Sequence, residues 1–425
     1  MESVIQNLQI TKENKMDKFA QLQKLYKVSV STGKTQVWFG WVDGDTVKCS
    51  YGELEGKLQI NEYQASAKNL GRSNETTSEQ QALIELEAMY QNQVDNKHYK
   101  LTEEEAKVSA SVCREPRKIT NYKDRYNKMS TKLLTSVKKN GSRGCVLEGK
   151  FYSKIGRPED IKVKHLKEAV DTLGTEATFD SEVYAEGLSL QRIRSAWLKP
   201  VKTDKEIIKI ANDLAKKRGF TSKVSSTHAA VKYLGYNPNE DAGKLKFFVF
   251  DIPDNTNKKF SERANDIDLF FEKVDTHGLG GCFEFLQPVE TNSHEERMLY
   301  LEEVVSQGNE GLVHYEPEGV YEFGKRSTNT AKSKPRYDSE ALVTGVEMCK
   351  NGEGKLLLQA CDELDKVKFK AMMKGSHESR MFDVQNQFIG KWVTFSYEEL
   401  SEAGVPTKPV VHETRLCDED GQPLE

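Results

Sequence analysis

A lysine beside a tight turn is the residue of this sequence best placed for nucleophilic chemistry. The hydrophobic stretch 133–137 (LLTSV) predicts a strand that delivers Lys138 to an Asn-Gly turn at 140–141. An amine attacks phosphorus only in its neutral form, and nearby cations such as Lys139 and Arg143 favour that form. A lysine ahead of an Asn-Gly turn is more often a solvated hairpin residue, so the assignment depends on the rest of the chain.

Five further segments follow the lysine, and each carries a residue type that can serve nucleotide chemistry. In chain order they supply a basic residue, a carboxylate, an aromatic ring, a second carboxylate and two lysines: Lys154, Glu182, Phe250, Glu310, Lys332 and Lys334. Each segment alone has a simpler interpretation, since Phe248 and Phe250 can both belong to a core and a Glu-Gly pair is usually a turn. The functional interpretation therefore rests on their joint order.

The elements that must position these residues alternate between strands and helices. A short buried strand is expected at 247–250. Helices with apolar residues at helical spacing are expected to open at Pro158, at Thr203 or Asp204, at Ser261 and at Ser293, the last with Glu296 in a capping box. Strands with helices packed outside them indicate an α+β domain.

After Pro335 the pattern changes to short strands separated by turn signals. These strands are expected at 341–346, 355–360, 367–371 and 392–397. Short strands at this spacing are typical of a small β-barrel.

Residues 25–100 predict a small domain of their own. Strands at 25–30 and 35–42 form a hairpin signal, and Ser78 with Gln81 forms a capping box ahead of a helix. Trp38 and Trp41 suit either a nucleic-acid stacking surface or a small core, and we favour the core. Residues 1–24 are a polar extension, and the charged stretch 101–120 is expected to be a linker.

Composition narrows the class of protein. The 425 residues carry a formal net charge of −4, and 30% of them are charged. Any basic surface must therefore come from a local cluster of lysines and arginines and not from the overall charge. Residues 118–157 hold eleven lysines and arginines but only two acids, whereas the end of the chain is acidic, so a polyanion is expected to bind the former. Seven scattered cysteines without a C-x-x-C pair argue against a zinc site and for reduced thiols in the cytoplasm. No signal peptide or membrane span is predicted.

The order of the segments resembles the covalent nucleotidyltransferases, and within them the ATP-dependent DNA ligases of phages and bacteria. The blocks 321–327 and 332–341 and the endings 390–394 and 400–406 resemble DNA ligase and its OB-fold in particular. The first domain is similar to the WGR-like module that precedes some phage ligases.

This resemblance implies an α+β, multi-domain fold. We expect a WGR-like accessory domain at 25–100, a nucleotidyltransferase (ATP-grasp-like) adenylation domain at 121–336, and an OB-fold domain with an acidic tail at 337–425. The implied activity is an ATP-dependent DNA ligase that seals 3′-hydroxyl/5′-phosphate nicks through a lysyl-AMP and a DNA-adenylate. Roles in DNA replication, repair and recombination would follow.

The resemblance also implies a role for each residue. Lys138 would attack the α-phosphate of ATP, and Phe250 would stack on adenine. Arg143, Lys154 and Glu182 would bind the nucleotide, with Arg143 and Glu182 on the ribose. Lys332 and Lys334 would neutralise the α-phosphate oxygens, and Glu310, with Glu182, would hold Mg²⁺, or Mn²⁺ in its place.

Three positions depart from the family pattern. Asn140 stands where the family usually has Asp, and Lys139 replaces an apolar or aromatic residue. Lys154 stands where arginine is usual, which removes a bidentate contact. The C-terminal arginine-lysine motif has no clear match, and Arg415 is the candidate for it.

Alternative functions remain to be weighed against a ligase. An RNA ligase or a capping guanylyltransferase would use the same lysine chemistry, but the block after Pro335 argues against both. An NAD-dependent ligase would bring a zinc module, and a P-loop is excluded because Gly33-Lys34-Thr35 lacks the upstream glycine. A DNA-binding protein with an inactive catalytic domain is the rival of another class. The expected partner is nicked double-stranded DNA, bound by a monomer in the cytoplasm, which would be the host cytoplasm if the gene is a phage gene.

Overall fold

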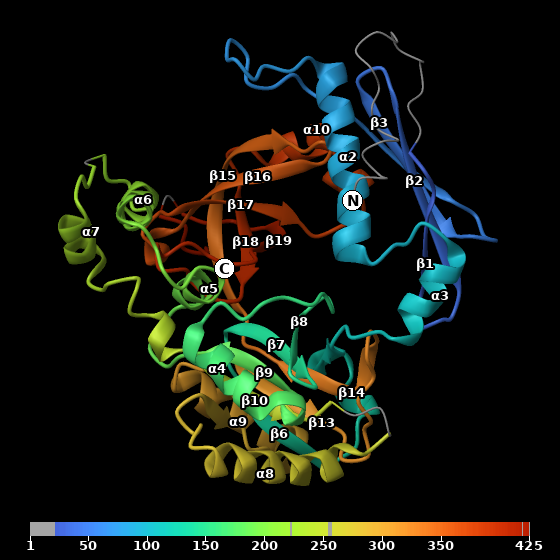
Figure 1. Ribbon diagram of the computed structural model, residues 1–425. Helices are drawn as coiled ribbons and strands as arrows, with labels where there is room; N and C mark the ends of the chain where they lie inside the picture. Colours follow the sequence, from blue (N-terminus) through green and yellow to red (C-terminus); the bar gives the residue numbers. More distant parts are fainter. Residues whose placement is uncertain (1–21, 222, 254–256, 419, 425) are drawn as a thin grey trace. The chain divides into compact units, whose positions relative to one another are not determined.

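The computed structural model describes residues 22–221, 223–253, 257–418 and 420–424, and the chain separates into two compact units (Figure 1). One unit comprises Met1–Cys113 with Cys349–Gly352, and the other comprises Arg114–Met348 with Glu353–Glu425. The division at Arg114 lies inside the stretch 101–120 that was expected to be a linker. Most of the predicted extension 1–24 lies outside the described residues.

The first unit is an antiparallel four-stranded sheet in the order β1-β2-β3-β4, followed by two helices. The elements are β1 (Leu25–Val28), β2 (Thr35–Asp43), β3 (Thr46–Glu53), β4 (Gln59–Gln64), α2 (Ser78–Lys97) and α3 (Glu103–Ser111). Trp38 lies in the core between the sheet and α2, as favoured from the sequence, whereas Trp41 lies on the other face and stacks on Phe39. This alternation follows from the two-residue period of a strand.

The capping box of α2 lies one residue earlier than predicted. Thr77 Oγ1 accepts from the Gln80 backbone N–H, and the Gln80 side chain accepts from the Thr77 N–H, so the prediction of Ser78 with Gln81 was wrong. Gln81 is buried instead and donates to Glu85 Oε1. Both pairs fit the same spacing rule, and only packing distinguishes them.

The second unit contains two five-stranded sheets and a barrel. The first sheet has the order β11-β10-β9-β7-β8, and the second has the order β12-β6-β13-β14-β5. Their strands are β5 (Lys118–Asn121), β6 (Leu133–Lys138), β7 (Ser142–Leu147), β8 (Lys150–Ser153), β9 (Phe179–Tyr184), β10 (Lys246–Asp251), β11 (Phe283–Phe285), β12 (Val289–Thr291), β13 (Gly311–Tyr315) and β14 (Arg326–Ser333). The turn after Lys138 therefore crosses from one sheet to the other and does not close a hairpin.

Six helices accompany these sheets. They are α4 (Lys164–Leu173), α5 (Leu190–Leu198), α6 (Asp204–Lys217), α7 (Thr227–Leu234), α8 (Phe260–Thr276) and α9 (His294–Ser306). Residues of α4, α5 and α8 join the main core, where the rings of Phe179, Phe247, Phe270 and Phe283 contact one another. Among the described residues, no helix is both long and apolar enough to cross a lipid bilayer.

Some predicted helix starts were confirmed and others were wrong. Thr203 caps α6, and Ser293 Oγ accepts from Glu296 N at 3.1 Å at the start of α9. Pro158 instead bridges to Tyr152, and the helix expected there begins at Lys164. In α8 the cap position is Lys259 and not Ser261.

The C-terminal part of the second unit is a closed, OB-fold-like barrel in the strand order β15-β16-β17-β19-β18. Its elements are β15 (Tyr337–Met348), β16 (Gly354–Ala360), β17 (Lys368–Met373), the short α10 (Phe382–Gln385), β18 (Trp392–Tyr397) and β19 (Val410–Thr414). The barrel interior is filled by alternate residues of these strands, including Val343, Leu358, Phe395 and Val411. Four of the five strands were predicted, and β19 was missed.

Candidate active site

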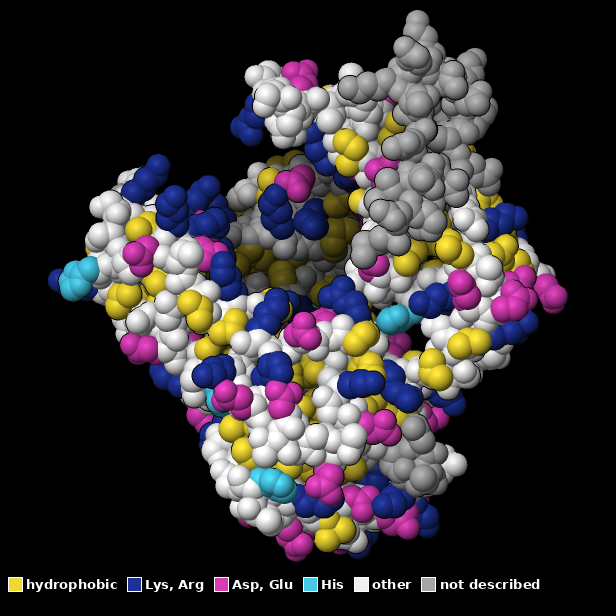
Figure 2. Space-filling model, viewed as in Figure 1, with side chains coloured by type: hydrophobic (Ala, Val, Ile, Leu, Met, Phe, Trp, Pro, Cys, Tyr) yellow, Lys and Arg dark blue, Asp and Glu magenta, His cyan; other side chains and the backbone are white. Residues whose placement is uncertain are grey.

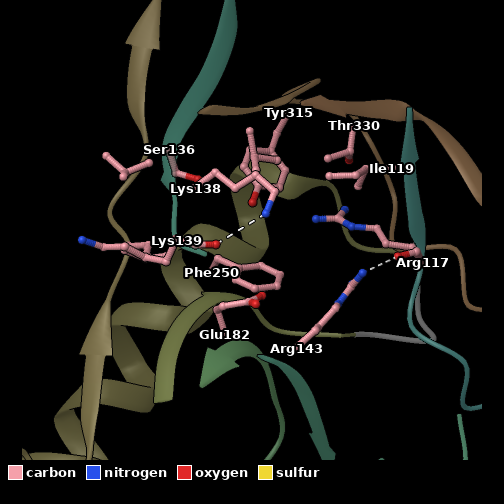
Figure 3. Close-up of a pocket in the computed structure, with 13 residues that line it drawn as sticks. Arg117, Ile119, Ser136, Lys138, Lys139, Arg143, Glu182, Phe250, Tyr315 and Thr330 are labelled. Atoms are coloured by element: carbon pink, nitrogen blue, oxygen red, sulfur yellow. Dashed lines mark hydrogen bonds between the residues drawn. The ribbon is translucent and has the colours of Figure 1, made fainter. Parts of the chain in front are cut away.

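A pocket in the second unit is lined by five of the residues singled out from the sequence, Lys138, Lys139, Arg143, Glu182 and Phe250 (Figure 3). Its walls come from both five-stranded sheets and include residues of β6, β7, β9, β10, β13 and β14. The lining residues are Arg117, Ile119, Ser136, Val137, Lys138, Lys139, Arg143, Glu182, Phe250, Leu286, Val313, Tyr315 and Thr330.

Lys138 ends β6, and its side chain extends into this pocket (Figure 3). Its Nζ forms an ion pair with Glu310 and also donates to the Lys139 carbonyl at 3.4 Å. Strand pairing explains this meeting, because Lys138 lies opposite Gly311 in the register of β6 with β13, directly after Glu310. The lysine is thus held by a partner 172 positions away in sequence.

The Glu310 carboxylate joins Lys138 to Lys334. Its Oε2 contacts Lys138 Nζ, and its Oε1 contacts Lys334 Nζ just beyond β14. Burial alone would raise the pKa of Glu310, but the two ammonium groups outweigh it and lower the pKa, so the carboxylate is ionised. The site therefore gathers one negative and two positive charges, and Lys138 connects them to the pocket that it lines.

Lys332 and Lys334 lie in different electrostatic environments. Burial and the neighbouring ammonium groups of Lys334 and Lys138 lower the pKa of Lys332. Burial also acts to lower the pKa of Lys334, but the Glu310 carboxylate reverses the effect and raises it. Lys334 is consequently the more firmly charged of the two.

Glu182 and Arg143 are directly opposite each other on β9 and β7. Glu182 Oε1 accepts from the Gly141 backbone N–H at 3.1 Å, and burial raises the pKa of this carboxyl to about 7. Arg143 donates to both oxygens of buried Asp180, at 3.0 and 2.5 Å, and to the Arg117 carbonyl at 2.6 Å. Asp180 thus orients a side chain that the sequence assigned to the nucleotide.

The two phenylalanines of β10 have different environments. Phe248 is buried and packs edge-on against Tyr184, whereas Phe250 is half-buried and its ring lines the pocket. The Arg143 guanidinium lies 5.7 Å from the centre of the Phe250 ring. Phe250 is therefore placed to stack on a ligand, and Phe248 belongs to the core.

The Lys139 side chain points away from the centre of the pocket (Figure 3). Its Nζ donates to Glu186 Oε1 at 2.6 Å and to Asn309 Oδ1 at 2.9 Å. This geometry favours Lys138 over Lys139 as the nucleophile.

Five expected site residues are not among those that line the pocket. Glu310 is linked to it through its ion pair with Lys138, and Lys334 through its ion pair with Glu310. Lys332 is linked to it through its charged neighbours Lys138 and Lys334.

The other two expected residues have no such link within the part of the chain that the structure describes. Lys154 is exposed in the turn after β8, and Arg415 follows β19 in the barrel, where it pairs with Glu340 at 3.6 Å. Their assignment to the nucleotide stays a prediction.

Several pocket residues were not anticipated. Ser136 and Thr330 each lie two positions before a catalytic candidate on the same strand, so the strand period could have identified them. Arg117 fell in the expected linker. Its guanidinium is buried between the rings of Tyr315 and Tyr321, at 5.2 and 4.8 Å, and pairs with Asp251 at 2.6 Å.

The residues present fit a divalent ion that arrives with a nucleotide better than one held by protein alone. Within the described ranges, no group of three or more His, Cys, Asp or Glu side chains could hold a metal ion. Mg²⁺ commonly binds one or two carboxylates together with phosphate oxygens and water. Glu310 and Glu182 offer such carboxylates.

Comparison with known proteins places the chain in a family. The protein-family model that is described as the ATP dependent DNA ligase domain matches residues 115–334, which are a little over half of the 425 residues. No curated protein sequence was found to match.

Two of the matching solved structures, with TM-scores above 0.5, show the same fold, and a third is a weaker match. A Lig E DNA ligase, described as binding DNA with a minimal scaffold, matches with a TM-score of 0.51 and 19% identity over 71% of this chain and 98% of its own. The structure named Pmar-Lig_Pre. matches with a TM-score of 0.51 and 16% identity over 74% of this chain and 71% of its own. The Chlorella virus DNA ligase-adenylate has 22% identity over 72% of this chain and all of its own, with a TM-score of 0.38.

Proposed function

This chain belongs to the ATP-dependent DNA ligase family, and from that membership we propose that it seals 3′-hydroxyl/5′-phosphate nicks in duplex DNA with Lys138 as the nucleophile. The observation that carries the proposal is the contact of one carboxylate, Glu310, with both Lys334 and Lys138, since Lys138 lines a pocket together with the aromatic ring of Phe250.

The first step of this proposal is self-adenylation. Lys138 Nζ, after losing a proton, attacks the α-phosphorus of ATP; an N–P bond forms, and the bond to pyrophosphate breaks. Lys332 and Lys334 face the oxygens on which negative charge grows, which lowers the barrier. Phe250 supports the base, and Arg143 and Glu182 bind the ribose.

The next two steps transfer the activated phosphate to DNA. A 5′-phosphate oxygen of the nick attacks the lysyl-AMP phosphorus, and Lys138 leaves as the amine. The 3′-hydroxyl then attacks the 5′-phosphate of the DNA-adenylate, and AMP departs as the phosphodiester forms. The same charges act in each step, because each occurs at a phosphorus in the same pocket.

Mg²⁺, bound through Glu310 and Glu182 with the phosphates of ATP, would supply positive charge that polarises the reacting phosphate. Glu310 would also keep Lys138 and Lys334 in place before the nucleotide binds.

We infer a DNA-binding surface from basic residues outside the pocket. Many basic residues of 118–157 are exposed, including Lys123, Lys128 and Lys150. A second basic cluster, defined here as Lys216, Lys217 and Lys223, lies at the end of α6 and in the following loop, and all three are exposed. Several Lys and Arg side chains are visible over the position of α6 (Figure 2). A monomer that encloses nicked duplex would use such contacts with the phosphate backbone.

The first unit, in this proposal, is a WGR-like accessory domain that strengthens nick binding. It has its own core and capped helix, so adenylation should not require it.

The proposal is tested by labelling the protein with α-labelled ATP and Mg²⁺. We expect a covalent protein-adenylate in the wild type and in Lys139→Ala, and none in Lys138→Ala. Full labelling of Lys138→Ala would transfer the assignment to another residue. Labelling by NAD alone, or sealing of nicked RNA but not of nicked DNA, would favour a different member of the superfamily.

A further inference from the structure

Thr330 presents a buried hydroxyl to the pocket. The residue is 1% exposed, it lines the pocket, and within the described residues its Oγ1 has no hydrogen-bond partner. Its carbonyl, in contrast, accepts a hydrogen bond from the Thr120 hydroxyl at 3.1 Å. A buried hydroxyl without a partner is costly, so a ligand atom that pairs with it gains affinity.

The strand fixes where this hydroxyl lies relative to the phosphate-binding lysines. Thr330 and Lys332 are two positions apart on β14, so their side chains point to the same face and are separated by roughly 7 Å. Thr330 is opposite Tyr315, and Lys332 is opposite Val313, which places Thr330 farther from the charged end at Glu310. A nucleotide whose α-phosphate lies at Lys332 and Lys334 would extend its base towards Thr330.

The surroundings suit the edge of a flat ring. Val313, Leu286 and Ile119 give the pocket apolar surface, and Phe250 offers an aromatic face. Arg117 lies at the same end of the pocket, and its Nε also lacks a partner in the described part of the chain. Two buried polar atoms that lack partners within the described ranges, Thr330 Oγ1 and Arg117 Nε, therefore lie beside apolar and aromatic surface of the pocket.

We propose that Thr330 Oγ1 hydrogen-bonds the Watson–Crick edge of the adenine ring, by accepting from the 6-amino group or by donating to N1. This inference rests on the proposed function, since it takes the pocket to hold ATP. A hydroxyl can donate or accept, so the contact adds affinity for adenine and does not by itself exclude guanine. In this proposal Thr330 helps to bind the nucleotide and takes no part in phosphoryl transfer.

The test measures equilibrium binding of ATP to protein that carries Lys138→Ala, in which no covalent adenylate forms. Adding Thr330→Val, which keeps the shape and removes the hydroxyl, should weaken ATP binding roughly tenfold. Thr330→Ser should restore most of the affinity. Thr328→Val, on the same face of β14 but exposed, is the matched control and should have no effect.

Two ATP analogues identify the contacted atom. Purine riboside triphosphate lacks the 6-amino group, and 1-deaza-ATP lacks N1. The loss of affinity caused by Thr330→Val should therefore be smaller for one of these analogues than for ATP. Because the hydroxyl has no protein partner among the described residues, Thr330→Val should leave the melting temperature unchanged or raised, unlike a structural defect. Equal affinity of the valine variant and its parent for ATP, or an equal penalty with all three nucleotides, would overturn this inference alone. Failure of the parent to bind ATP would overturn the proposed function as well.

Discussion

His314 Nε2 lies 2.7 Å from Ser333 Oγ, and this contact ties β13 to the end of β14, where Ser333 stands between Lys332 and Lys334. On the other side of the ring, His314 Nδ1 lies 3.0 Å from Thr135 Oγ1 on β6, three positions before Lys138. His314 is fully buried. One imidazole thus links the three strands whose ends supply Lys138, Glu310 and the lysine pair.

The first prediction is that the stability of the folded protein depends on pH through His314. Burial, with Arg297 and His294, lowers the pKa of His314 to about 3, so the folded protein keeps the ring neutral. The unfolded chain takes up a proton near pH 6.5, so the stabilisation is full above that pH and is lost as pH falls towards 3. Between pH 7 and 5 the loss is roughly 2 kcal/mol.

The measurement compares melting temperatures of the wild type and His314→Gln at pH 7 and pH 5. We expect the variant to be less stable at pH 7 and to lose less on acidification. His228→Gln, an exposed histidine on α7, is the control and should follow the wild type. Identical slopes for all three proteins would contradict the assignment.

The chemistry of the site was predictable because its residues lie in short segments whose order is visible in the chain. Lys138 was assigned from its place at the end of a strand. Glu310, Lys332 and Lys334 were instead assigned from the order of their segments, which resembles that of the ligase family. The structure brings Lys138, Glu310 and Lys334 together.

What escaped prediction depends on contacts distant in sequence. Asp180 on β9 forms an ion pair with Arg143 on the neighbouring strand β7. Arg117, which lies in the stretch that was expected to be a linker, lines the pocket.

The same limit applies to the fold. Local pattern predicted four barrel strands, several other strands and five helices (α2, α4, α6, α8 and α9). It could not show that the turn after Lys138 leads from one sheet to another, because pairing partners are set by packing. The cap of α2 fell on Thr77 in preference to Ser78 for a similar reason, since Gln81 is taken into the core. The strand Val410–Thr414 was missed because three exposed residues follow its two apolar ones.

The second prediction uses the pKa of Glu182, which burial raises to about 7. If its carboxylate accepts hydrogen bonds from ribose hydroxyls, affinity should rise as the group ionises between pH 6 and pH 8, by up to about tenfold. Binding of α,β-methylene-ATP, which cannot transfer AMP, measures this directly. Glu182→Gln should bind more weakly at pH 8 and show a flatter profile. An unchanged profile in this variant would remove Glu182 from ribose binding.

The third prediction concerns the basic cluster Lys216, Lys217 and Lys223. Neutralising all three to Gln should weaken binding of nicked DNA and reduce the slope of log K against log salt by about 0.9 for each phosphate that the variant no longer neutralises. Self-adenylation should be unaffected. The control neutralises Lys164, Lys167 and Lys209, which make ion pairs with acids one turn away and carry the same total charge. Equal effects of the two triple variants would show that net charge, and not this cluster, matters.

The last prediction separates the nucleophile from the lysines that stabilise charge. Lys138 forms and breaks a bond to AMP, so Lys138→Ala should stop self-adenylation and the sealing of ordinary nicks. A nick that already carries DNA-adenylate needs no lysyl-AMP, so Lys138→Ala should still close it, though slowly. Lys332 and Lys334 act wherever a phosphate oxygen gains charge, so alanine at either position should slow both reactions by about 10²–10³-fold.

These rates are measured in single turnovers on pre-adenylated nicks, with Lys139→Ala as the control for removal of a neighbouring positive charge. Lys334 shares Glu310 with the nucleophile, so Lys334→Ala also frees one oxygen of that carboxylate, whereas Lys332→Ala leaves the ion pair intact. We therefore expect Lys334→Ala to be the slower variant in self-adenylation. Wild-type sealing rates in both lysine variants would show that these charges act only on ATP, and failure of Lys138→Ala alone would show that the nucleophile also serves the final step.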